Sequence, residues 1–111
     1  MIKEILTAAG VTHKQGRFPK PPEGTYAVYF DDVEVEAADR VTPATRAGLP
    51  RIYHHNVRVE VYEPKPDDKT ELAIEAELDA RGISWTKEDR YRLQEVQRYQ
   101  VLYEFYYTTK L

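Results

Sequence analysis

Residues 53–82 read YHHNVRVEVYEPKPDDKTELAIEAELDARG and predict a strand followed by a helix. In the first part, one face of the strand carries Tyr53, His55, Val57, Val59 and Val61. The other face carries His54, Asn56, Arg58, Glu60 and Tyr62. Alternation with a period of two is typical of a half-buried strand in an antiparallel sheet. Two prolines, Pro64 and Pro66, end this strand.

The remainder of the stretch carries a helix signal at each end. Asp67 and Asp68 are both candidate N-caps, and Glu71 follows Asp68 by three residues, as in a capping box. The apolar residues between the caps are Leu72, Ala73, Ile74, Ala76, Leu78 and Ala80. Gly82 then supplies the left-handed conformation that often ends a helix.

The segments before this stretch predict one more helix and further strands. A short N-terminal helix is indicated by Ile2, Ile5, Leu6 and Ala9, followed by Gly10. Residues 13–24 contain prolines and glycines and predict an extended polar connector. Residues 25–37 alternate, and they predict either a strand pair or one long bent strand. The paired Asp31 and Asp32 suit a tight turn or a bulge.

After the second helix, Ile83 and Trp85 predict a short strand, and residues 87–90 either continue it or turn. A last strand is predicted over residues 95–108. This order predicts an α+β fold: a mostly antiparallel sheet with an N-terminal helix and a second helix packed on it. We expect a single domain over residues 1–111, with a mobile loop at residues 38–50.

Composition excludes several classes of function. Acidic and basic residues are interspersed and the formal net charge is −3. We therefore expect neither tight nor specific binding to nucleic acid. The absence of cysteine excludes disulfides and thiolate metal sites, and it fits a reducing compartment. No apolar run approaches the roughly 18 residues that span a bilayer, so we expect no membrane partner.

The residue types that carry chemistry do not converge. His54 and His55 are strand neighbours that point to opposite faces, and His13 is distant in sequence. The only serine, Ser84, lacks the glycine frame of a nucleophile elbow. Carboxylates are plentiful, but nothing around them shapes a substrate pocket. We therefore expect no metal, no cofactor, no catalytic residues and no enzymatic activity.

Tyrosine is the compositional oddity, with nine residues in the chain. On the last strand we expect a sheet core of Tyr99, Tyr103, Phe105 and Tyr107. The opposite faces carry Leu102, Tyr106 and Tyr62, which are candidates for helix packing or for a subunit contact. Arg40 and Arg46 complete the candidate interface residues.

Four stretches carry a resemblance to a known family. They are NVRVEVYEP at residues 56–64, ELDARGI at 77–83, WTK at 85–87 and YQVLYEFYY at 99–107. With the order of elements around them, the chain resembles the tail-completion and tail-terminator proteins of long-tailed bacteriophages and prophages. The resemblance covers most of the chain and is strongest over residues 53–110.

This resemblance implies a ring, commonly a hexamer, that caps the tail tube and joins it to the head connector. The implied partners are further copies of the chain, the tail tube protein and the head–tail connector protein. The implied location is the virion tail, and the host cytoplasm during assembly. A head–tail connector stopper or minor capsid component is the alternative from the same class. A small nucleic-acid or regulatory binding module is the alternative from another class.

A ring of this kind has a lumen through which the genome passes. One strand carries the carboxylates Asp31, Asp32, Glu34 and Glu36, which would repel phosphate. We therefore take these four residues as candidates for a lumen-facing acidic lining.

Overall fold

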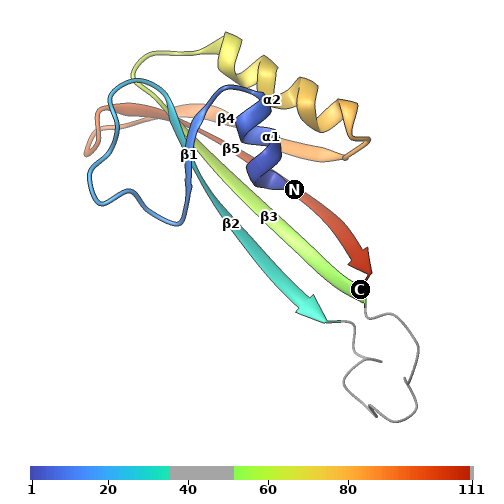
Figure 1. The fold of residues 1–111 in the computed structure, drawn as a ribbon. Coiled ribbons are helices and arrows are strands. Elements are labelled where there is room, and N and C mark those ends of the chain that lie inside the picture. Colours follow the sequence, from blue (N-terminus) through green and yellow to red (C-terminus); the bar gives the residue numbers. More distant parts are fainter. Residues whose placement is uncertain (36–51, 111) are drawn as a thin grey trace, which may run out of the picture.

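The fold is a five-stranded sheet with two helices on one face, in a computed structural model that describes residues 1–35 and 52–110 (Figure 1). The elements are α1 (Ile2–Ala8), β1 (Thr12–Gln15), β2 (Tyr26–Val35), β3 (Ile52–Glu63), α2 (Asp68–Ala80), β4 (Trp85–Leu93) and β5 (Arg98–Lys110). The strand order is β1-β2-β3-β5-β4. All neighbouring strands are antiparallel except β1 and β2. The predicted α+β fold is confirmed.

The core lies between the helices and one face of the sheet, which we call the helix side. On β3 this face presents Val57, Val59 and Val61, which pair with Phe105, Tyr103 and Val101 of β5. The helices contribute the buried residues Ile2, Ile5, Leu6, Ile74 and Leu78. These contacts follow from the alternation along β3, because its apolar set can be buried only on one face.

The tyrosines on the helix side of β5 differ in burial according to their position along the strand. Tyr103 and Phe105 are buried in the core, as predicted, and Tyr107 is half-buried against it. Tyr99, expected in the core, lies outside it at the far end of the helix side. There it is half-buried and packs under the guanidinium of Arg92, 5.3 Å from the ring centroid.

Two expectations for the first half of the sheet need correction. Asp31 and Asp32 form neither a turn nor a bulge, because β2 is one strand whose register with β3 runs unbroken through both residues. The long partner β3 supplies pairing along the whole of β2. Within the expected connector, β1 was missed; it is a short, mostly exposed edge strand that pairs in parallel with residues 26–29 of β2.

The two strands in the second half of the sheet have bounds that differ from the expected ones. Residues 87–90 continue the strand that begins at Trp85, with a register shift between Glu88 and Tyr91. The last strand begins at Arg98 and not at Glu95, because residues 94–97 form the turn between β4 and β5. Gln97 adopts φ +54° in that turn.

A cluster of charged side chains, here called the α2 ion cluster, fastens α2 to the sheet beside its apolar contacts. It consists of Glu63, Glu71, Glu75, Lys87 and Arg90. Lys87 Nζ lies 2.9 Å from a Glu71 oxygen and 2.8 Å from a Glu75 oxygen. Arg90 Nη2 lies 2.6 Å from the second Glu71 oxygen. Glu71 is therefore held by two cations although it is only 3% exposed.

Glu63 lies at the bottom of this cluster and is fully buried. Its Oε1 is 3.2 Å from Arg90 Nε, in an orientation that makes no hydrogen bond. Burial, together with the neighbouring Glu71 carboxyl, raises the pKa of Glu63 to about 8. Burial acts in the same direction on Glu71, but its interactions with Glu63, Arg90 and Lys87 outweigh burial and lower its pKa. At neutral pH Glu63 is therefore the protonated member of the pair.

Asp67 is the residue that caps α2. Its carboxylate accepts a hydrogen bond from the Thr70 backbone N–H at 3.0 Å, and from the hydroxyls of Thr70 and Thr25 at 2.8 and 2.7 Å. Asp68, the other candidate, is 81% exposed and contacts Arg90. We expect Asp67→Ala to lower the free energy of unfolding by about 1 kcal/mol in urea titrations. Asp68→Ala should cost less than about 0.5 kcal/mol, and a larger loss there would contradict this assignment.

Candidate assembly surface

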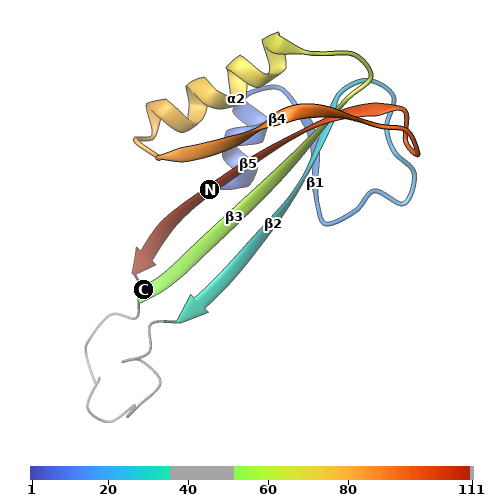
Figure 2. The same ribbon diagram turned by 180° about the vertical axis from the view of Figure 1, so that it is seen from behind.

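Three strands extend beyond the helices as an arm (Figures 1 and 2). We define the arm as residues 30–35 of β2, 52–58 of β3 and 104–110 of β5. On one side, β1 pairs with β2 only as far as Tyr29. On the other side, β4 begins at Trp85, which pairs with Phe105. Among the described residues, no strand therefore covers the outer edge of β2 at 30–35 or of β5 at 106–110.

The helix side of the arm is held by a cross-strand cluster of polar and aromatic groups. His55 Nδ1 lies 3.1 Å from both oxygens of Asp31, and His55 Nε2 lies 3.0 Å from Thr109 Oγ1. The Tyr107 ring stacks on the imidazole with centroids 4.2 Å apart. The cluster joins β2, β3 and β5 within the arm. It accounts for Asp31 as a structural residue of the arm.

The opposite face of the sheet, here called the open face, is not covered by α1 or α2, the helices of the described residues (Figure 2). Tyr62, Leu102 and Tyr106 share this face, as the alternation predicts, but the alternative that they pack against a helix is wrong for the described helices, which lie on the other face. Tyr106 is 72% exposed. Tyr62 is half-buried; it donates a hydrogen bond to Glu60 at 2.8 Å and accepts one from Gln100 at 2.9 Å. Burial, reinforced by the bond to Glu60, raises the pKa of Tyr62 to about 12.

The structure places the three described members of the expected acidic lining on two different faces of the sheet. Asp32 and Glu34 lie on the open face and are exposed, where they pair across β2–β3 with Asn56 and His54. Asp31 lies on the helix side in the His55 cluster. Glu36, Arg40 and Arg46 lie outside the described residues, as does the expected mobile loop at 38–50. Glu104 of β5 lies on the open face together with Asp32. Asn56 and Arg58 of β3 lie between these two carboxylates.

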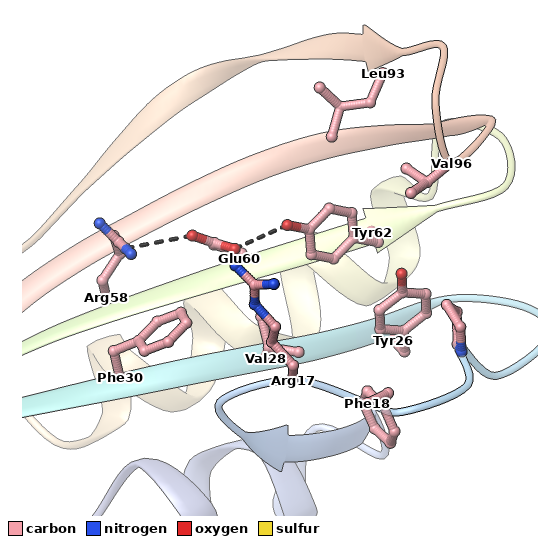
Figure 3. A pocket seen from close by; sticks show the side chains of 11 residues that line it. Arg17, Phe18, Tyr26, Val28, Phe30, Arg58, Glu60, Tyr62, Leu93 and Val96 are labelled. Atoms are coloured by element: carbon pink, nitrogen blue, oxygen red, sulfur yellow. Dashed lines mark hydrogen bonds and ion pairs between the residues drawn. The ribbon is translucent and has the colours of Figure 1, made fainter.

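A groove crosses the open face from the end near Tyr26 to the start of the arm at Phe30 and Arg58 (Figure 3). Its volume is about 330 Å³. The floor comes from β2 and β3, and includes Tyr26 and Tyr62, whose rings stack with centroids 5.1 Å apart. One wall is the connection between β1 and β2, with Phe18, and the other includes Leu93 and Val96. Sequence reasoning missed this groove; the one available signal was Phe18, an aromatic residue in a connector otherwise expected to be polar.

The described residues show no arrangement for metal chemistry. Their histidines, aspartates and glutamates form no group of three or more that could hold a metal ion. His54 and His55 lie on opposite faces of β3, as predicted. Within residues 1–35 and 52–110, neither helix has the length and apolar character needed to cross a membrane.

Comparison with known proteins finds a structural similarity to a chain of a solved virion particle. No family model and no curated protein matches it. Its structure is similar to a chain in the "Virion of native gene transfer agent (GTA) particle", with a TM-score of 0.59 and 16% sequence identity. The match covers 96% of this chain and 84% of that chain. At this identity, the similarity shows a shared fold across nearly the whole molecule.

Proposed function

We propose that this protein is a structural subunit of a bacteriophage or prophage tail, of the tail-terminator type, and not an enzyme. In this role, copies of the chain form a ring that caps the tail tube and joins it to the head connector. The observation that carries the proposal is the arm, a three-stranded sheet with two edges and one face that no other strand or helix of residues 1–35 and 52–110 covers. The similarity to a chain of a virion particle supports the same class of protein.

The two edges of the arm suit a head-to-tail contact between copies. Both β2 and β5 are antiparallel to β3, so they run parallel to each other. The β5 edge of one copy could therefore pair with the β2 edge of the next in a parallel ladder. Such a contact joins two different surfaces, and contacts of this kind generate a closed ring when the rotation between successive copies closes. Pairing would also remove the exposed edges, which otherwise favour aggregation.

The position of the helices sets which face would line the lumen. In a ring closed through the arm edges, α1 and α2 lie outside, because they cover the helix side and would fill a narrow channel. The open face then lines the lumen with Asp32, Glu34 and Glu104. A lining of this charge would repel phosphate and let a genome pass without binding it. Asp31 belongs to the helix side and is not part of this proposed lining.

The ring is tested by the mass of the purified protein in solution, with and without the tail tube protein of the same virus or prophage. We expect assembly into a ring, at least on the tube, visible by electron microscopy. Val33→Lys should reduce ring formation by about tenfold, because Val33 is 49% exposed on the uncovered β2 edge.

Leu72→Lys is the matched control for this experiment. Leu72 is also an exposed apolar residue, at 64%, but it lies on α2 away from both arm edges. This variant should assemble normally. A protein that stays monomeric with the tube protein present would contradict the proposed function. Equal assembly of the two variants would contradict the edge contact alone. The position of the gene beside that of the major tail protein would separate a terminator from a connector stopper.

One observation favours the second candidate, a nucleic-acid binding module. Aromatic residues on a sheet with interleaved basic residues are typical of single-strand binding, and the groove has Phe30 and Tyr62 together with Arg58. Acidic residues share that face, Glu60 among them. A gel-shift assay with single-stranded DNA at modest salt decides the question, since a tail subunit should not retain the DNA.

A further inference from the structure

The groove on the open face has the form of a channel with one closed end. Its top, the end next to Tyr26, is closed by a contact between two segments. There Arg98 Nη2 donates a hydrogen bond to the Pro22 carbonyl at 3.4 Å and joins the β1–β2 connection to the start of β5. In the opposite direction the floor continues along β2 and β3 into the arm, past Phe30 and Asn56. A ligand can therefore lie along the strands and end against the closed top.

The two ends of the floor differ in chemistry. At the closed end lie the stacked rings of Tyr26 and Tyr62, with Phe18 meeting Tyr26 edge-on at 5.5 Å. At the end toward the arm lies Arg58, whose side chain is 51% exposed and whose guanidinium sits 4.9 Å above the Phe30 ring. An extended ligand thus meets an aromatic surface at one end and a cation at the other.

The groove also carries more positive than negative charge. Arg58 pairs with Glu60 at 3.3 Å, and the carboxylate of Glu60 additionally accepts the Tyr62 hydrogen bond. Arg17 reaches from the β1–β2 connection toward Glu60 (Figure 3), but it makes no ion pair within the part of the chain that the structure describes. Among the residues that line the groove itself, two guanidinium groups stand against one carboxylate, and Asp32 and Glu104 lie beyond Arg58 toward the arm. A carboxylate on the ligand would complement the two guanidinium groups through charge-assisted hydrogen bonds.

We propose that this groove binds an extended peptide segment of another protein, with an apolar side chain and a carboxylate on the same face, four residues apart. The spacing follows from the register. Tyr26 pairs with Tyr62 and Phe30 pairs with Arg58, so the two ends of the floor are separated by four residues of β2. At about 3.3 Å per residue this is about 13 Å, and residues i and i+4 of a strand point the same way. The binding holds whether or not the copies close into a ring.

Two fluorescein-labelled peptides of identical composition test the proposal. The first, Gly-Ser-Phe-Ser-Val-Ser-Glu-Ser-Gly, places Phe, Val and Glu on one face. The second, Gly-Ser-Phe-Ser-Val-Glu-Ser-Ser-Gly, moves the carboxylate to the other face. By fluorescence polarisation, the first should bind about tenfold more tightly than the second. In NMR spectra the first should shift the backbone amide signals of Phe18 and Val96, which line the groove walls.

Charge reversal gives the matched protein variants. The double variant R17E/R58E should weaken binding of the first peptide about tenfold, and it should bind better a version with Lys in place of Glu. Arg92→Glu reverses a charge on the helix side, outside the groove, and should leave the affinity unchanged. Equal binding of the two isomers, or no binding of either, would overturn the proposal. Shifts confined to residues 106–110 would overturn it in favour of strand addition to the arm. None of these results bears on the ring, which the mass measurement tests separately.

Discussion

Replacing Arg90 with methionine is expected to lower the free energy of unfolding by about 3 kcal/mol at pH 7. Arg90 contacts Glu63 at 3.2 Å, Glu71 at 2.6 Å and Asp68 at 2.7 Å. At pH 7 its guanidinium pairs with the buried carboxylate of Glu71 from the side of β4, beside the protonated Glu63. Removing one partner of a buried ion pair costs more than the pair contributes, because the remaining charge stays desolvated. Urea titration followed by circular dichroism measures the change.

Arg92→Met provides the control for this substitution. Arg92 lies two residues further along β4, is exposed, and contacts the Tyr99 ring at 5.3 Å without a buried acid beside it. Its loss should cost less than about 1 kcal/mol. Similar losses in the two variants would show that the strand, and not the α2 ion cluster, is sensitive to substitution.

The stability of the wild-type protein is expected to fall as pH rises from about 5 to about 8. The pKa of Glu63 is raised from its ordinary value of 4.5 to about 8 in the folded protein. Between these two values the folded protein holds a proton that the unfolded chain has released. The contribution of Glu63 is therefore fully present below pH 4.5 and is lost as pH rises through the folded pKa, at about 1 kcal/mol per pH unit.

Two other carboxyls, those of Asp67 and Glu71, change the stability in the opposite direction and over a lower range of pH. Hydrogen bonds hold the pKa of Asp67 and of Glu71 below their ordinary values of 3.8 and 4.5, although burial opposes the shift. Their contribution is present above those values and is lost as pH falls through the lowered ones. We therefore expect greatest stability near pH 5, between the two windows.

Glu63→Gln isolates the contribution of Glu63. Glutamine stays neutral and keeps an N–H donor toward Glu71, so this variant should lose the slope between pH 5 and 8 and should be more stable than the wild type at pH 8. Glu104→Gln, on the exposed open face, should keep the wild-type slope. Urea titrations at four pH values give the comparison. A slope that survives in Glu63→Gln would assign the proton to another group.

Part of the α2 ion cluster could not be predicted from the sequence. Glu71 and Glu75 stand where a helix pattern indicates a capping or solvated residue. Both face the sheet, because β4 brings Lys87 and Arg90 beneath them. The charged residues 87–90 carry no alternation that distinguishes a strand from a turn. The inward position of Glu71 and Glu75 depends on residues 87–90 forming a strand. Neither segment alone therefore shows that the other supplies its ion-pair partners.

The same holds for the assembly surface. Alternation along β3 and β5 correctly placed Tyr62, Leu102 and Tyr106 on one face. It could not show that the β1–β2 connection folds over that face, because nothing periodic marks the contact of Phe18 with Tyr26. Nor could it assign Asp31 to the His55 cluster, since this depends on β2 and β3 staying paired through both aspartates.

Local patterns were sufficient for most elements of this protein: the amphipathic α1, the capped and glycine-terminated α2, the central strand β3 and the inner face of β5. Each depends on side-chain periodicity or on a turn residue, and these are properties of neighbouring positions. Tertiary structure decided the parallel edge strand, the uncovered edges of the arm, the groove and the buried protonated Glu63. Each of these depends on which distant segment lies alongside, and therefore on pairing and burial that no single stretch of the chain contains.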